Sequence, residues 1–140
     1  MIRAILDPGV LVSALLSRSG APARLLSLWS RGHYDLVVSP HLLTELAIVL
    51  RREKFRRYLS EEEAEAFVHW LKGAALLVPD PAQRPRYTRD PNDDYLIAAA
   101  KAAGVPLVVS GDRDLLAFAD PPPVVLTPAA FLDALKAGPG

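Results

Sequence analysis

Two carboxylates occur where the chain leaves short apolar segments. Asp7 directly follows the apolar run 2–6, and Asp112 follows the run 105–109 after a Ser-Gly step. Each run is typical of a strand buried on both faces, so both side chains are expected at the carboxyl ends of strands. In a parallel sheet these ends meet at the edge where ligands bind. A single carboxylate there is more often a turn or cap residue, but two at one edge favour a site.

Further acids lie on predicted helices. Glu45 lies at the rim of an apolar stripe and, taken alone, is typical of a surface glutamate that supports its helix. Asp93 and Asp94 lie in the first turn of the helix expected over 93–103. The helix dipole favours acidic residues there even when they have no functional role. Each acid has an ordinary structural explanation. The set as a whole points to a site made of Asp7, Glu45, Asp94 and Asp112.

The chemistry that such a set supports is metal-assisted phosphodiester hydrolysis. Mg²⁺ takes oxygen ligands from one or two carboxylates, from water and from substrate phosphates. A phosphodiesterase of this kind needs carboxylates from several elements. The chain has no cysteine, no Gly-x-Ser-x-Gly motif and no phosphate-binding glycine loop. His33, His41 and His69 share no metal-ligand spacing, and we interpret them as surface or core residues.

Charge adds little to this hypothesis. Sixteen basic and sixteen acidic residues cancel, so the net charge does not indicate a nucleic-acid partner. The segment 51–57 carries five basic residues and one phenylalanine. It is compatible with steering an RNA strand toward the acids, and equally with a solvated helix end.

Short apolar segments alternate with helical patterns, which predicts an α/β fold of three α/β/α layers with a mostly parallel central sheet. The proline-rich segment 79–92 must be a loop. Strands are expected over 2–6, 35–39, 76–78, 105–109 and 124–126. Helices are expected over 10–17, 21–29, 40–50, 61–74, 93–103 and 128–136.

Length and composition indicate one domain over residues 1–140. The chain is 51% hydrophobic and 23% charged, which is a globular profile. The first residues lack the pattern of an export signal, and no apolar stretch approaches the roughly 20 residues of a membrane span. We therefore expect a cytoplasmic protein without membrane contact.

Four segments in this order resemble the acidic blocks of the PIN-domain nucleases: LDPGVLVSALLS, SPHLLTELAIVL, RDPNDDYLIAAA and VVSGDRDLL. The likeness covers residues 2–131 and is greatest to the VapC-type toxin components of toxin–antitoxin systems. It implies a PIN-like domain, hydrolysis of RNA with Mg²⁺ or Mn²⁺, a homodimer and a small antitoxin partner. Matched to the family's four acids, Asp7, Asp94 and Asp112 are expected to bind metal, and Glu45 to complete the cluster or orient the attacking water.

Two points stay open at this level. Asp93 competes with Asp94, because on a helical wheel it lies with the apolar residues 96, 97 and 100. We prefer Asp94, because the residues that follow it stand at the family's offset. Where the family usually has Asp-Thr-Asn, this chain has Asp7-Pro8-Gly9. This departure predicts weaker metal binding and makes a catalytically silent module that binds RNA or protein the main alternative. An aspartate-nucleophile phosphatase is disfavoured, since it usually needs a second aspartate where Gly9 stands.

Overall fold

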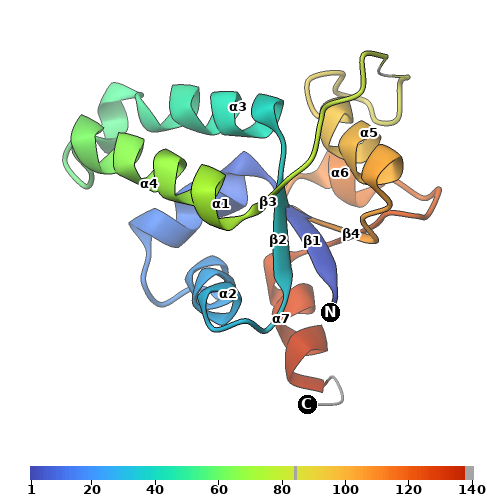
Figure 1. Cartoon of the computed structure of the whole chain (residues 1–140), viewed down its shortest axis with the longest axis horizontal. Coiled ribbons are helices and arrows are strands. Elements are labelled where there is room, and N and C mark those ends of the chain that lie inside the picture. Colours follow the sequence, from blue (N-terminus) through green and yellow to red (C-terminus); the bar gives the residue numbers. More distant parts are fainter. Residues whose placement is uncertain (84, 138–140) are drawn as a thin grey trace.

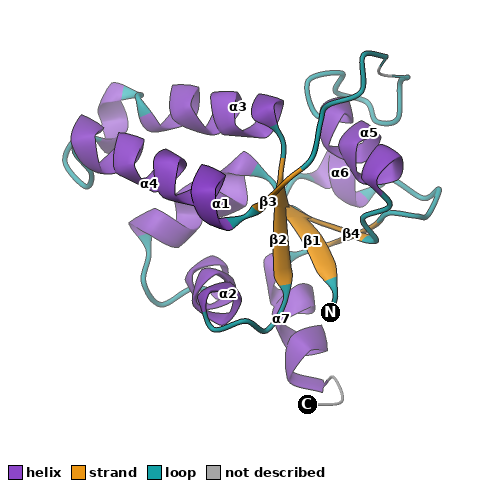
Figure 2. Ribbon diagram, viewed as in Figure 1, coloured by secondary structure: helices purple, strands orange, loops and turns teal. Residues whose placement is uncertain are grey.

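The computed structural model describes residues 1–83 and 85–137, and its centre is a parallel sheet (Figures 1 and 2). The strand order is β3-β2-β1-β4-β5, and every pair in the sheet is parallel. The predicted α/β class with a parallel sheet is therefore confirmed. The strands are β1 (Arg3–Leu6), β2 (Asp35–Val38), β3 (Leu76–Leu77), β4 (Leu107–Val109) and β5 (Val124–Leu126).

Helices connect the strands, and most of them begin at residues that suit a helix start. Ser39 accepts a hydrogen bond from the amide of Leu42, and Ser60 forms a capping box with Glu63. The helices are α1 (Pro8–Leu16), α2 (Ala21–Ser30), α3 (Pro40–Leu50), α4 (Glu61–Ala74), α5 (Asp94–Ala103), α6 (Arg113–Leu116) and α7 (Pro128–Ala137), with a 3₁₀ turn η1 (Glu53–Phe55).

The apolar strands are buried between helices on both sides of the sheet. In the view of Figure 1, α1, α2, α3 and α4 lie on one side of the strands, and α5 and α6 lie on the other. β1, β2 and β4 are almost wholly buried, as their continuous apolar runs require. One hydrophobic cluster extends from Ala4 to Leu132 and joins both layers to the sheet.

Several element boundaries differ from those expected, most of them by one residue. α1 begins at Pro8 rather than near residue 10, because proline suits the first helical position, where an amide hydrogen would have no partner. β4 is shorter than the run 105–109, and Pro106, which lacks an amide hydrogen, directly precedes it. α5 begins after a turn over 91–93. No helix within the described ranges is long and apolar enough to cross a membrane.

The strand order places a crevice at the carboxyl edge of the sheet. β1 is central, with β2 on one side and β4 on the other, so the connections that leave β1 and β4 diverge at this edge. The amide of Asp7 donates to the carbonyl of Val109, 3.0 Å away, which continues the β1–β4 ladder into the residue after β1. The first aspartate is thus fixed by the sheet itself.

Candidate active site

A cavity of about 450 Å³ includes three of the four predicted acids. Asp7, Glu45 and Asp112 line it, and the fourth lining acid is Asp93. The remaining walls come from the first turns of α1, α2 and α7 and from residues around α5 and β4: Pro8, Gly9, Val10, Ser13, Pro22, Asn92, Tyr95, Leu96, Gly111 and Pro128. Residues far apart in the sequence therefore form one acidic cavity.

Asp7 is held by backbone and side-chain donors. Its Oδ1 accepts a hydrogen bond from the amide of Val10 at 2.9 Å and so caps α1. Burial raises the pKa of this carboxyl group, while hydrogen bonds from Ser110, Val10 and Gly9 act in the opposite direction. Pro8 and Gly9 supply no polar side chain, so the support for Asp7 comes from the backbone and from Ser110.

Ser110 links the two aspartates that follow strands. It is fully buried, and its Oγ accepts a hydrogen bond from the amide of Asp112 at 3.0 Å. Its hydroxyl hydrogen is then free to be donated to Asp7, a hydrogen bond that lowers the pKa of Asp7. Sequence reasoning missed this residue, although a serine between a buried strand and Gly111-Asp112 was a usable signal.

Asp112 also acts as a helix cap. Its Oδ1 accepts a hydrogen bond from the amide of Asp114 at 2.8 Å, which begins α6. Unlike the buried Asp7, Asp112 is exposed. The Asp112 side chain thus caps α6 and also lines the cavity, so a structural role and a role in the site are compatible.

Asp93 carries the clearest sign of crowded negative charge. Burial raises its pKa to about 7, and the neighbouring carboxyl group of Asp112 contributes next, followed by the charges of Asp90 and Asp7. Its Oδ2 is buried and has no hydrogen-bond partner among the described residues. A buried carboxylate oxygen without a donor, beside a second carboxylate, requires a proton or a cation.

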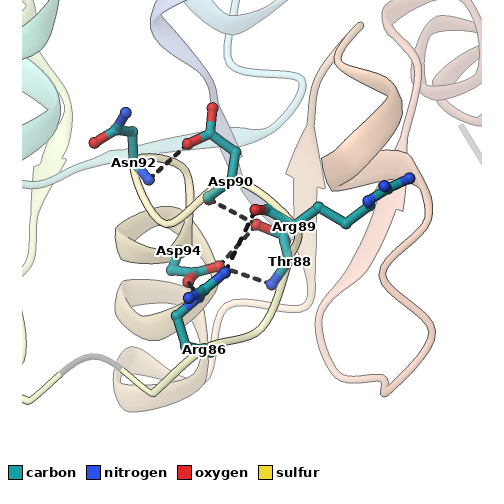
Figure 3. Close-up of polar contacts among 6 residues, drawn as sticks. All are labelled: Arg86, Thr88, Arg89, Asp90, Asn92 and Asp94. Atoms are coloured by element: carbon teal, nitrogen blue, oxygen red, sulfur yellow. Dashed lines mark hydrogen bonds and ion pairs between the residues drawn. The ribbon is translucent and has the colours of Figure 1, made fainter.

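Asp94 does not line the cavity. Its carboxylate instead contacts residues of the 79–92 loop (Figure 3). It is buried, and its Oδ1 lies 2.8 Å from both the amide nitrogen and the Oγ1 of Thr88. Its Oδ2 lies 3.5 Å from Nε of Arg86. Of the two adjacent aspartates, Asp93 lines the cavity and Asp94 does not, because Asp94 is taken up by contacts with the 79–92 loop.

The same loop fixes the start of α5. Thr88 Oγ1 also lies 2.8 Å from the carbonyl oxygen of Asp90, and that carbonyl accepts from the amide of Asp93 at 3.0 Å. Asp90 Oδ1 accepts from the amide of Asn92, as Figure 3 shows. Asp90 therefore caps the turn before α5.

Glu45 reaches the cavity from α3 and lies close to one histidine. Its Oε1 lies 3.6 Å from Nε2 of His41, one helical turn earlier. The ring of His41 stacks on Tyr95, with 3.9 Å between ring centroids. Burial raises the pKa of the Tyr95 phenol well above its usual range, and the charges of Glu45, Asp7, Asp93 and Asp80 add to the shift. Tyr95 is therefore a neutral hydrogen-bond donor in an acidic cavity.

The donor set fits a hard divalent cation with few protein ligands. Within the described ranges, no three histidine or acidic side chains are arranged so that they could hold a metal ion together. The orphaned Oδ2 of Asp93 and the adjacent Asp112 nevertheless offer the one or two carboxylates that Mg²⁺ uses alongside water and phosphate oxygens. The cavity therefore fits a partly hydrated ion better than a closed cage of protein ligands.

The basic segment 51–57 has a structural role in part. It includes η1, and the guanidinium group of Arg56 donates to the carbonyl of Leu50 at the end of α3. A cation at this position interacts favourably with the helix dipole. This contact supports the helix-end explanation for Arg56 and leaves the other basic side chains of the segment without an assigned role.

Residues 3–114 match the sequence model of the family described as "PIN domain". The chain belongs to the PIN domain family. Proteins with a PIN domain are in general nucleases that use divalent metals. The expected family resemblance is thereby confirmed, and the matched region contains all four lining acids.

This PIN domain is similar to a curated protein in sequence and to solved structures in fold. The uncharacterized protein MJ1680 of Methanocaldococcus jannaschii is 25% identical over 119 residues, which are 85% of this chain and 76% of the relative. PAE2754 of Pyrobaculum aerophilum is similar with a TM-score of 0.66 at 16% identity, covering 98% of this chain and 91% of the other.

Two further solved structures come from protein pairs. A chain of VapBC2 from Rickettsia felis, bound to a DNA fragment from its promoter, gives a TM-score of 0.63 at 14% identity and covers 89% of this chain and 97% of the other. A chain of FitAcB from Neisseria gonorrhoeae gives 0.58 at 20% identity, with 90% and 98% covered. At these identities the likeness establishes the fold alone.

Proposed function

We propose that this PIN domain is a metal-dependent ribonuclease and the toxin component of a toxin–antitoxin pair. The observation that carries the proposal is the cavity at the carboxyl edge of the sheet, where Asp7, Glu45, Asp93 and Asp112 meet. An acidic cavity of this kind disfavours anionic RNA unless cations neutralise it. The same arrangement is suited to binding a cation together with a phosphate.

In this proposal Asp7, Asp93 and Asp112 hold Mg²⁺ or Mn²⁺, directly or through water. Asp93 takes the place expected for Asp94, since its Oδ2 is buried without a partner and Asp94 is satisfied by Thr88 and Arg86. A bound divalent ion lowers the pKa of water and offsets negative charge on a reacting phosphate. Titration of each metal into the chain compares the affinities for Mg²⁺ and Mn²⁺ and identifies the preferred ion.

The chain's own groups then orient the substrate and the attacking water. Glu45, on the wall formed by α3, accepts a hydrogen bond from that water. This hydrogen bond orients a lone pair of the water oxygen toward the phosphorus atom. The first turns of α1, α2 and α7 line the cavity, and their amide dipoles favour a phosphate group over bulk solvent. Tyr95 remains protonated and can donate a hydrogen bond to a substrate oxygen.

The partner proposal rests on apolar surface away from the acids. A groove of about 530 Å³ lies between α3 and α4, and both apolar residues, such as Leu43, Ala47 and Val68, and charged residues line it. Ile48 and Trp70 on the same two helices are 55% and 43% exposed. Such surface is suited to an apolar segment of a small antitoxin or to a second copy of the chain in a homodimer. Solved relatives include the VapBC2 and FitAB pairs, which supports a protein partner.

We further propose that residues 1–140 act as a single PIN-like domain. The hydrophobic cluster is continuous from β1 to α7, so the segment after the matched region packs on the same core. Phe131 on α7 is fully buried and lies edge-on against Tyr34, with ring centroids 5.0 Å apart. Removal of α7 would expose this contact.

The test is RNA cleavage by the purified chain with and without Mn²⁺ or Mg²⁺. We expect metal-dependent cleavage that falls by roughly 1000-fold in Asp112→Asn, equivalent to about 4 kcal/mol of lost transition-state stabilisation. Asp133→Asn, on α7, serves as the control for loss of one negative charge. A wild-type chain that binds RNA or protein but cleaves no RNA with either metal would favour the catalytically silent module.

A further inference from the structure

His41 is in contact with two residues of the cavity wall and has no place in the proposed chemistry so far. It is the second residue of α3, and its side chain is 32% exposed. Its Nε2 lies 3.6 Å from Oε1 of Glu45, and its ring stacks on the buried ring of Tyr95. Glu45 and Tyr95 both line the cavity. The imidazole therefore joins two walls that come from different helices.

The position of the imidazole is fixed from two directions. The ring centroids of His41 and Tyr95 are 3.9 Å apart, and the two planes meet at 36°. The amide of His41 donates to Oδ2 of Asp80 at 2.8 Å, which ties the first turn of α3 to the segment that follows β3. A ring held by stacking and by its own backbone presents its Nε2 in one direction at little further entropic cost.

Glu45 needs such a partner more than the other acids do. Its side chain is 44% exposed, and within the described ranges the imidazole of His41 is the one basic group within 4 Å of its carboxylate. Fixing a free glutamate side chain in one orientation costs conformational entropy. Asp7 and Asp112, by contrast, are already fixed by capping hydrogen bonds.

We propose that His41 is a positioning residue, which holds the Glu45 carboxylate on the cavity wall in the orientation that the attacking water requires. The inference rests on the proposed nuclease function and assigns to the imidazole no contact with RNA or metal. An ordinary pair of residues one helical turn apart would add only a little helix stability. The stacking on Tyr95 is what distinguishes His41 from such a pair.

Two substitutions separate the two contacts of the imidazole. His41→Phe keeps a ring against Tyr95 and removes the nitrogen near Glu45. His41→Gln places an amide nitrogen near the position of Nε2 and restores a donor to Glu45. We expect kcat for RNA cleavage to fall about 10-fold in His41→Phe with KM unchanged, as for loss of a group that orients a ligand. His41→Gln should recover most of that loss.

A double-mutant cycle tests whether His41 acts through Glu45. In a Glu45→Gln background, His41→Phe should cause no further loss of kcat, whereas a general effect on folding would lower kcat equally in both backgrounds. His33→Phe, in the turn before β2 at the opposite edge of the sheet, is the matched control and should leave kcat unchanged.

The outcomes are distinguishable. A wild-type chain without metal-dependent RNA cleavage overturns the proposed function and this inference with it. An active wild-type chain whose His41→Phe variant keeps the wild-type kcat, or loses equal activity with and without Glu45, overturns the inference alone. Circular dichroism of each variant identifies any loss of fold. If His41→Phe does not fold, the kcat of His41→Gln tests the inference: a kcat close to wild type supports it, and a 10-fold loss in a folded His41→Gln overturns it.

Discussion

Asp7 and Asp112, and Asp93 and Asp94, form two pairs of aspartates that are positioned by different parts of the molecule. The strand-end pair, Asp7 and Asp112, follows β1 and β4, where the parallel ladder continues through the amides of Asp7 and Ser110. The helix pair, Asp93 and Asp94, precedes α5 and is positioned by the 79–92 loop through Thr88. Sheet register fixes the first pair, whereas loop contacts select which member of the second pair faces the cavity.

This difference explains why adjacent aspartates of identical chemistry have opposite surroundings. Asp94 is buried with three donor groups around it, so its charge is compensated within the protein. Asp93 faces Asp112 and has a buried oxygen without a donor. A metal ligand must retain unused lone pairs, and of the two residues Asp93 has them.

The comparison is tested most strongly by alanine at each member of the helix pair. We expect Asp93→Ala to lower RNA cleavage by at least 100-fold while the melting temperature is kept, because a ligand is lost and repulsion is relieved. Asp94→Ala should instead lower stability by about 1–3 kcal/mol, since the partly buried amide of Thr88 loses its acceptor.

Both variants require cleavage assays and urea unfolding under the same conditions. Asp90→Ala, which removes the cap of the preceding turn, is the control for disturbance of the loop. If Asp94→Ala stays fully stable and loses its Mn²⁺ affinity, Asp94 is the ligand and the division of the helix pair is reversed.

Much of the fold, and the choice of sheet edge, was predictable from the sequence. Continuous apolar runs indicate buried parallel strands, and Ser39-Pro40 and the capping box at Ser60 mark helix starts. A strand followed by an aspartate then places that carboxylate at the carboxyl edge. These signals are local, so one sequence is enough to interpret them.

The choice between Asp93 and Asp94 was not predictable in the same way. Every residue from Asp94 to Ala100 is buried, so α5 has no polar face in this stretch to set its rotation. The start of the helix is set by Thr88, which lies in a loop without periodicity. The pairing of His41 with Glu45 was accessible from their spacing of four residues, but the stack on Tyr95 joins distant segments.

The burial of Asp93, together with its repulsion by Asp112, gives a pH test. The pKa of Asp93 is about 7 in the folded chain and near 4 in an unfolded one, so between these values the folded state binds a proton that the unfolded state lacks. Stability of the metal-free chain should therefore fall as pH rises from 4 to 7 and level off above 7. The raised pKa of Asp7 acts in the same direction.

Melting temperatures in EDTA at pH 5 and pH 8 measure this effect. The wild-type chain should melt at a lower temperature at pH 8, and the difference between the two pH values should shrink in Asp93→Asn. Because Asp93 is only partly buried, solvent screening reduces the size of the effect. If the difference in melting temperature between pH 5 and pH 8 is the same in Asp93→Asn as in the wild type, the Asp93 carboxyl group does not cause the pH dependence.

The smallest expected effect concerns the strand-end pair and the glycine that follows Pro8. A Cβ atom at Gly9 would lie 3.1 Å from Oδ1 of Asp7, which is the oxygen that accepts from Val10. Gly9→Ala should therefore displace this carboxylate by a few tenths of an ångström and weaken Mn²⁺ binding by about 10-fold or less.

Gly73→Ala is the matched control, because Gly73 lies in α4 and a Cβ there meets nothing within 4 Å. It should raise stability by about 0.5–1 kcal/mol through helix propensity and leave Mn²⁺ affinity unchanged. Isothermal titration of Mn²⁺ into both variants compares the two glycines directly. Equal affinity in Gly9→Ala and Gly73→Ala would mean that Ser110 and the amides of α1 hold Asp7 firmly enough to tolerate the added methyl group. In that case the lack of polar side chains at Pro8 and Gly9 does not weaken metal binding. The hydrogen bonds that such side chains would give to Asp7 are then fully replaced by those from Ser110 and from the first turn of α1.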